Sequence, residues 1–334
     1  MAQGPITALV MHPVVREELL RPDHFERLGR ICRLVSAEPL RTFEGAEALA
    51  RVQVLITSWG SPRIDAAALD ALPSLRLVAH LAGSVKGFVD EVVWRRGIQV
   101  VNAVAANAVP VAEYTLAAIL FCNKHVLRLA AFYHRHHENR APWTKEAPNV
   151  GNYRKTIGVI AASHVGRKLL ELMRPFDFTV QLYDPYVTAL EARELGATKV
   201  TLSELLAGSD VVTLHAPLLP ETRHMIGARE LALMKDGATL INTARGGLVD
   251  HDALISELTA GRIHAVLDTT EPDVLPPTSP LYRLPNVLLT PHIAGSLGNE
   301  TQRLSDHIID EVERYARGQP LRHRVRFDDL VRLA

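Results

Sequence analysis

Short apolar runs alternate with longer segments of helical periodicity along the first third of the chain. Each run is rich in Val, Ile and Leu and is bounded by Gly, Pro or Asn, which is typical of buried parallel strands. Helical segments between such runs, of which residues 63–72 are one, predict a parallel α/β sheet. The predicted strands of this part cover residues 6–11, 52–57, 75–81 and 98–102.

A second α/β series follows a long, mostly helical segment at residues 109–137. Near the C-terminal end, residues 300–317 place Leu304, Ile308 and Val312 on one side, as in an amphipathic helix. Because 334 residues are many for one core, we expect two domains. The predicted strands of the second series cover residues 156–160, 179–183, 211–214, 239–242, 264–267 and 287–289.

The composition is that of a soluble globular protein, since 47% of the residues are hydrophobic and 37 basic residues balance 37 acidic ones. A net charge near zero gives no reason to expect nucleic acid or a membrane surface as a partner. Cys32 and Cys122 are too few for a disulfide framework and suit a reducing compartment. Residues 1–15 do not resemble a signal peptide, and no run is long enough to span a bilayer. We therefore expect a cytoplasmic protein.

Arg245, Asp273 and His292 each come shortly after a predicted strand of the second series. The carboxyl ends of parallel strands form the crevice in which open α/β sheets bind ligands. A guanidinium can hold a carboxylate by two parallel hydrogen bonds, and an imidazole exchanges a proton near neutral pH. The three residues therefore predict a fixed cation, an orienting base and a proton donor.

Residues 156–186 have the order of a dinucleotide-binding unit: strand, tight turn, helix, strand, acidic residue. Of the three glycines of the motif Gly-x-Gly-x-x-Gly, only Gly166 is present, and Ala161 and Ser163 replace the others. If Ala161 must adopt a positive φ, we expect strain of about 1 kcal/mol. Ser163 would place a side chain toward the pyrophosphate, although its hydroxyl could donate a hydrogen bond to it. The alternative is an α/β domain with an empty pocket.

Asp184 ends the strand that follows, 18 residues after Gly166, where a carboxylate can accept hydrogen bonds from an adenosine ribose. No Arg stands beside it to meet a 2′-phosphate, so NAD is favoured over NADP. The start of the helix is an anion site whatever residue precedes it. The cofactor contacts predicted here are Ser163, His164, Val165, Gly166 and Asp184.

With these residues in view, the chain resembles the D-isomer-specific 2-hydroxyacid dehydrogenases over residues 55–325. The resemblance implies two Rossmann-like, doubly wound parallel-sheet domains, with the cofactor domain (105–295) inserted into a substrate domain (1–104 and 296–334). It also implies a homodimer in which the cofactor domains supply most of the contact. The matching motifs are Asn-Thr-Ala-Arg-Gly-Gly-Leu-Val-Asp at 242–250, Thr-Pro-His-Ile-Ala-Gly-Ser at 290–296, the loop 214–223 and the crossing segment 102–115.

The resemblance also implies the roles of the site residues. Arg245, Asp273 and His292 would be catalytic, and Arg245 would also bind the substrate. Gly83 and Ser84 would offer backbone N–H groups to the substrate carboxylate. Trp59 could wall the substrate pocket or pack in the core. The further contacts implied for NAD come from Pro217, Thr222, Thr243, Ala244, Arg245, Asp268 and His292.

Two departures from the family pattern affect these roles. The acid position usually carries Glu, whereas Asp273 is one methylene shorter, and Glu271 is the fallback partner of His292. In the substrate loop, residues 81–86, Lys86 replaces the usual acidic residue. The substrate preference of the family therefore does not transfer to this chain.

The sequence thus predicts an oxidoreductase that transfers a hydride between NAD(H) and a small 2-keto or D-2-hydroxy acid. One alternative is a non-catalytic NAD-sensing scaffold or corepressor of the same fold. Another is a dehydrogenase of the same fold acting on formate or phosphite. No metal is expected, because His134, His136 and His137 are not spaced to share one helix face.

Overall fold

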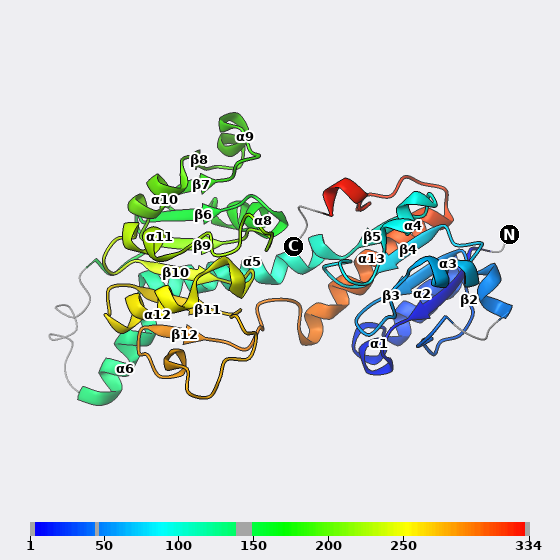
Figure 1. Cartoon of the computed structure of the whole chain (residues 1–334), viewed down its shortest axis with the longest axis horizontal. Coiled ribbons are helices and arrows are strands. Elements are labelled where there is room, and N and C mark those ends of the chain that lie inside the picture. Colours follow the sequence, from blue (N-terminus) through cyan, green and yellow to red (C-terminus); the bar gives the residue numbers. More distant parts are fainter. Residues whose placement is uncertain (1–3, 44–46, 138–148, 331–334) are drawn as a thin grey trace. The chain divides into compact units, whose positions relative to one another are not determined.

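The computed structural model describes residues 4–43, 47–137 and 149–330 (Figure 1). The chain forms two compact units, Met1–Asn107 with Ser296–Leu333, and Ala108–Gly295. Helix α5 (Val104–Asn123) begins in the first unit, where its first turn packs Ala106 into the core. Each unit contains one parallel sheet.

The sheet of the first unit has five parallel strands in the order β2-β1-β3-β4-β5. All four predicted runs are longer than the corresponding strands, by one to three residues. The two-residue edge strand β2 was not predicted, because Arg33 and Leu34 form no apolar run. The strands are β1 (Ile6–Val10), β2 (Arg33–Leu34), β3 (Val54–Thr57), β4 (Leu77–His80) and β5 (Gln99–Asn102).

Helices cover both faces of this sheet, since alternate strand residues point to opposite sides. On one face, α1 (Pro13–Leu19), α2 (Pro22–Ile31) and α13 (Thr301–Ala316) bury Leu19, Leu28 and Ile308 against the strands. On the other face, α3 (Ala66–Ala71) and α4 (Glu91–Arg95) bury Leu69 and Val93. The predicted C-terminal amphipathic helix is therefore confirmed as α13.

The sheet of the second unit has seven parallel strands in the order β12-β11-β10-β9-β6-β7-β8. All six predicted strands are present with the predicted bounds, and only the short, exposed edge strand β8 was missed. The order reverses at β6, which lies between β9 and β7. The strands are β6 (Thr156–Ile160), β7 (Thr179–Tyr183), β8 (Thr198–Lys199), β9 (Val211–Leu214), β10 (Thr239–Asn242), β11 (His264–Leu267) and β12 (Val287–Leu289).

This second sheet is also doubly wound. One face packs against α5, α8 (His164–Met173) and α9 (Ala189–Glu194), through apolar residues such as Ile119 and Leu169. The other face packs against α10 (Leu202–Gly208), α11 (Ala228–Leu233) and α12 (His251–Thr259), with Leu205 and Leu254 in the core. The predicted class, two doubly wound parallel α/β domains, is confirmed. Short 3₁₀ turns lie at Glu47–Arg51, Gly246–Leu248, Pro280–Tyr282, Gly298–Glu300 and Phe327–Asp329.

The predicted, mostly helical segment at residues 109–137 is confirmed, and it consists of two helices. Helix α5 ends at Asn123, and α6 (Val126–His136) begins after His125, whose φ of 47° is incompatible with a right-handed helix. Within the described part of the chain, α5 is the one helix that is long and apolar enough to cross a membrane. A core helix of a soluble protein passes the same test of length and composition.

Candidate active site

The turn between β6 and α8 has the shape of a dinucleotide-binding loop. Ala161 has a φ of 76°, in the left-handed region that glycine adopts readily and alanine does not. A Cβ on Gly166 would lie 2.1 Å from the carbonyl oxygen of Ala161, so this contact between helix and turn requires glycine. The hydroxyl of Ser163 accepts a hydrogen bond from the N–H of Gly166 at 3.3 Å and caps α8. Ala161, at the position of the first glycine of the motif, therefore holds a strained conformation in this turn.

The start of α8 adds positive charge to this turn. His164 and Val165 are the first helical residues, and N–H groups at a helix start attract anions. Arg167 donates a hydrogen bond from Nε to the carbonyl oxygen of Ala162 at 2.9 Å, which holds its guanidinium beside the turn. Sequence reasoning missed Arg167, although its position directly after Gly166, in the first turn of the helix, was a usable signal.

Asp184 follows β7 and is 7% exposed beside the same turn. Its carboxylate oxygens accept hydrogen bonds from the backbone N–H groups of Ala162 at 2.8 Å and Tyr186 at 2.7 Å. Each oxygen retains acceptor capacity, so Asp184 can also accept hydrogen bonds from ribose hydroxyls. The turn, the helix start and this carboxylate therefore fit a dinucleotide.

The loop after β9 is closed by a threonine. The hydroxyl of Thr222 donates to the carbonyl oxygen of Pro217 at 2.6 Å and accepts from the N–H of Leu219 at 2.8 Å. This side chain therefore stabilises the loop itself. The predicted contacts of Pro217 and Thr222 with NAD depend on that shape.

Arg245 is positioned by an amide at the end of β10. Asn242 accepts a hydrogen bond from the N–H of Ala244 at 3.1 Å and donates to the carbonyl oxygen of Arg245 at 2.9 Å. The next residue must be glycine, because a Cβ on Gly246 would lie 2.0 Å from the backbone of Thr270. Burial lowers the pKa of the Arg245 guanidinium, and the nearby charge of Asp273 opposes that shift. The side chain is a half-buried cation at the carboxyl end of the sheet.

Thr243 also lies at this strand end and is 7% exposed. Its hydroxyl lies 3.1 Å from that of Thr115, which donates to the carbonyl oxygen of Val111 within α5. Thr243, which is buried, and Ala244, which is half-buried, connect β10 to Arg245.

Asp268, directly after β11, builds the turn that carries His292. Its carboxylate is 2% exposed and accepts hydrogen bonds from the Thr290 hydroxyl at 2.7 Å and from the N–H groups of Ile293 and Ala294 at 2.8 and 2.9 Å. The N–H of His292 donates to the backbone carbonyl of Asp268 at 3.0 Å. His292 is exposed and has a φ of 56°. The resemblance implies a contact of Asp268 with NAD, and the structure adds its hydrogen bonds with this turn.

The structure does not join His292 to either candidate acid. Asp273 is exposed and forms neither a hydrogen bond nor an ion pair with His292. Glu271 pairs with Arg223 at 2.9 Å and with His224 at 3.7 Å. The hydrogen bond from Arg223 holds the pKa of Glu271 below its usual value. Glu271 is therefore engaged elsewhere, whereas Asp273 lies near Arg245.

The predicted substrate loop lies in the first unit, after β4. Asn102 donates from Nδ2 to the carbonyl oxygen of Gly83 at 2.8 Å, and Ser58 donates to the carbonyl oxygen of Leu81 at 3.1 Å. Gly83 and Ser84 are half-buried in this loop. Trp59 follows β3 and is 43% exposed, so it does not pack in the core. These residues share the carboxyl edge of the first sheet.

The fold has two α/β domains, a dinucleotide-binding turn and a half-buried arginine at a strand end. This combination is typical of enzymes that use a dinucleotide cofactor. The model of the D-isomer specific 2-hydroxyacid dehydrogenase NAD-binding domain matches residues 116–294. Hydroxypyruvate reductase of Thermotoga maritima is 30% identical over 284 residues, which cover 83% of this chain and 89% of that relative. The chain belongs to the D-isomer specific 2-hydroxyacid dehydrogenase family, and its cofactor is NAD.

Other relatives extend this comparison. D-3-phosphoglycerate dehydrogenase of Methanocaldococcus jannaschii is 31% identical over 303 residues, covering 90% of this chain and 56% of that relative. The chain thus spans about half the length of several curated relatives. A crystal structure of a protein from Thermus thermophilus has a TM-score of 0.71 and 28% identity, covering 96% of this chain and all of the other. A phosphoglycerate oxidoreductase from Rhizobium etli, at 22% identity, has the same fold with a TM-score of 0.82 over 96% of this chain and 98% of its own.

Replacing the strained alanine tests the geometry of the turn. The variant Ala161→Gly removes a left-handed alanine but makes the unfolded chain more flexible, so we expect a net gain of about 0.5–1 kcal/mol in unfolding free energy. Chemical denaturation measures this difference. As a control, Ala189→Gly at the start of α9 should lower stability, and a loss of stability in Ala161→Gly would contradict the observed φ.

Proposed function

We propose that the chain reduces a small 2-keto acid to the D-2-hydroxy acid with NADH, and catalyses the reverse oxidation with NAD. The observation that carries this proposal is the pair Arg245 and His292, each following a strand of the cofactor unit. A protein that only binds the nucleotide needs neither a proton donor nor a cation for the substrate.

In this mechanism, bound NADH supplies the hydride to the carbonyl carbon. Arg245 holds the substrate by two hydrogen bonds and polarises its carbonyl oxygen. His292 gives a proton to that oxygen in reduction and removes it in oxidation. Gly83 and Ser84 bind the substrate carboxylate through backbone N–H groups, and Trp59 lies against the substituent on the keto carbon.

We assign Asp273 as the acid that orients His292, because Glu271 already pairs with Arg223 and His224. Catalytic hydrogen bonds often form only in the ligand complex, and we propose that the bond between Asp273 and His292 forms there. Asp268 acts differently. It holds the turn of His292 through three hydrogen bonds and, by resemblance, contacts the nicotinamide side of NAD together with Thr243 and Ala244.

The direct test is a titration of the protein with NADH, followed by an absorbance assay. Glyoxylate, hydroxypyruvate, pyruvate and bulkier 2-keto acids would be tried in turn, and both lactate enantiomers in the reverse direction. We expect NADH binding, turnover with at least one keto acid and preference for D-hydroxy acids. Binding of NADH without turnover on any acid would support the NAD-sensing alternative. Turnover on formate or phosphite alone would support a dehydrogenase that acts on those small oxyanions.

Removing the proton donor, or replacing the forked guanidinium by a simple ammonium, should lower turnover strongly without abolishing NADH binding. General acid catalysis contributes about 100- to 10,000-fold, so we expect His292→Ala to lose at least about 100-fold in kcat. Arg245→Lys loses the second hydrogen bond and should fall by a similar factor. Steady-state kinetics measure both, with His134→Ala on the exposed face of α6 as the matched control. Near-parent turnover in both variants would rule out these roles.

The two candidate acids are separated by the pH dependence of reduction. A carboxylate beside an imidazole stabilises its protonated form, which is the form that donates a proton in reduction. Loss of that carboxylate should therefore move the high-pH decline of kcat to lower pH. We expect this displacement in Asp273→Asn and not in Glu271→Gln. The opposite result would identify Glu271 as the partner of His292.

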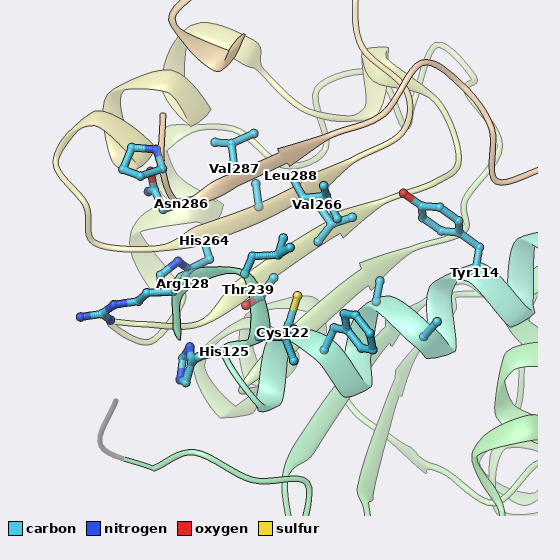
Figure 2. A pocket seen from close by; sticks show the side chains of 17 residues that line it. Tyr114, Cys122, His125, Arg128, Thr239, His264, Val266, Asn286, Val287 and Leu288 are labelled. Atoms are coloured by element: carbon cyan, nitrogen blue, oxygen red, sulfur yellow. The ribbon is translucent and has the colours of Figure 1, made fainter. Parts of the chain in front are cut away.

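We further propose a cytoplasmic homodimer formed by the cofactor units, without a nucleic-acid or membrane partner. An apolar cavity of about 250 Å³ lies between α5 and α6 on one side and β10, β11 and β12 on the other. Figure 2 shows Cys122 of α5 directed into it, opposite Val287 and Leu288. Beside it, Phe121 and Leu127 are 55% and 50% exposed. A second copy would bury this continuous apolar surface, which is unusual on a monomer.

Charge placed on this surface should dissociate the dimer. Light scattering after size exclusion should give twice the chain mass of 36.8 kDa for the parent. We expect Leu127→Asp to give the monomer mass, because burying an unpaired carboxylate is costly. The control Leu190→Asp, on a 63% exposed residue of α9, should stay dimeric. A monomeric parent, or a dimeric Leu127→Asp, would contradict the assignment of this surface.

A further inference from the structure

A second cavity of the cofactor unit lies at the amino ends of its strands, the edge of the sheet opposite the candidate active site. Its volume is about 190 Å³, whereas one water molecule needs about 10–15 Å³. Of the residues that line it, Lys155 and Asp210 directly precede β6 and β9, and Thr239 and His264 begin β10 and β11. This amino-edge cavity has room for a small ligand.

Basic side chains outnumber acidic ones around the amino-edge cavity. Within the described part of the chain two carboxylates line it, and both already have partners. Asp210 accepts a hydrogen bond from the N–H of Thr156 at 2.8 Å and pairs with Lys235 at 3.3 Å. Asp236 pairs with Arg262 at 3.4 Å. The basic residues of the lining are His125, Arg128, Lys155, Lys235 and His264.

The two imidazoles of this lining lie side by side. The ring centroids of His125 and His264 are 5.8 Å apart, and Figure 2 shows both residues with Arg128 at one end of the neighbouring apolar cavity. Burial lowers the pKa of His125, and the charges of Arg128 and Lys155 lower it further. Burial, His125 and Arg128 lower the pKa of His264 in the same way. The surrounding charge is therefore positive, and an anion would offset it.

A buried amide of the same lining lacks an acceptor. Asn123 ends α5 and is 5% exposed, and its Nδ2 forms no hydrogen bond with the described part of the chain. Its backbone carbonyl oxygen accepts a hydrogen bond from the N–H of Gly151 at 2.8 Å, which fixes the end of the helix. A buried donor without an acceptor is costly, so native proteins satisfy such groups with protein atoms, water or a ligand.

We propose that the amino-edge cavity binds a dianionic oxyanion, either free phosphate or the phosphate group of a small metabolite. Lys155 and Arg128 supply positive charge, and Asn123 donates from Nδ2. The imidazoles of His125 and His264 take up protons when the anion binds and then donate to it. A phosphate group suits this lining because its several oxygens accept charge-assisted hydrogen bonds from different directions. The site is independent of the proposed function.

The test is a calorimetric titration with inorganic phosphate. Saturating NADH and oxamate are present, so that the turn before α8 and the cation Arg245 are occupied. We expect one phosphate per chain. Lys155→Gln removes a charge-assisted hydrogen bond, so the dissociation constant should rise about tenfold or more. The matched control is Lys124→Gln, on an exposed residue beside Asn123 that is not part of the lining, and its constant should not change.

The variant Asn123→Leu separates binding from stability. Leucine is close to asparagine in size and removes the unsatisfied donor. Without phosphate, we therefore expect a thermal midpoint equal to that of the parent or higher. With phosphate, the dissociation constant should rise as it does in Lys155→Gln.

The role of the imidazoles is tested with sulfate, whose charge is constant between about pH 6 and pH 8. Because a bound anion raises their pKa values, sulfate affinity should increase as the pH falls through this range. The double variant His125→Gln/His264→Gln should lose that dependence. Burial raises the pKa of the Cys122 thiol in the same lining to about 11, so the thiol stays neutral. The other lining groups keep their charge in this range: Arg128, Lys155, Lys235, Asp210 and Asp236.

Methyl phosphate separates the two sources of the anion. Tighter binding than that of inorganic phosphate would support a phosphate monoester as the ligand, and weaker binding would support the free ion. Equal phosphate affinity in the parent, Lys155→Gln and Asn123→Leu would overturn the site, as would the lack of saturable binding of phosphate and sulfate to the parent. Phosphate binding that follows these predictions in a chain without keto-acid turnover would support the site and contradict only the proposed function.

Discussion

The buried carboxylate of Asp268 is the constraint on which the candidate active site depends. It accepts hydrogen bonds from the Thr290 hydroxyl and from two N–H groups of the turn after β12. An ionised group with 2% exposure is tolerated only when such bonds replace its water. Because β11 and β12 are neighbours in the sheet, this carboxylate ties the two strand ends together. The position of His292 follows from that connection.

The cofactor turn shows the same principle, in which several weak contacts hold one unfavourable conformation. The N–H of Ala161 donates to the carbonyl oxygen of Tyr183, and that of Ala162 donates to Asp184. Arg167 donates to the carbonyl oxygen of Ala162 from the other side. These bonds hold the turn in this conformation against the cost of a left-handed alanine, which is about 1–2 kcal/mol. The missing first glycine of the motif therefore raises the conformational energy of the turn.

Much of this could be predicted from the sequence, because apolar runs and their boundaries depend on local chemistry. The strands of the second unit and the placement of Arg245 after β10 follow from such runs. The edge strand Arg33–Leu34 could not be found, since its two residues form no apolar run. The break at His125 and the positive φ of Ala161 are set by tertiary packing, which periodicity does not report. The same holds for the ion pair between Glu271 and Arg223, which connects loops distant in the sequence.

We propose that Arg245 and His292 act on the same carbonyl oxygen. A crystal structure of the complex with NADH and oxamate measures this directly. We expect a ring nitrogen of His292 and the guanidinium of Arg245 both to lie within hydrogen-bond distance, about 2.6–3.2 Å, of the oxamate carbonyl oxygen. A complex in which oxamate is bound and the imidazole points away from that oxygen would contradict it.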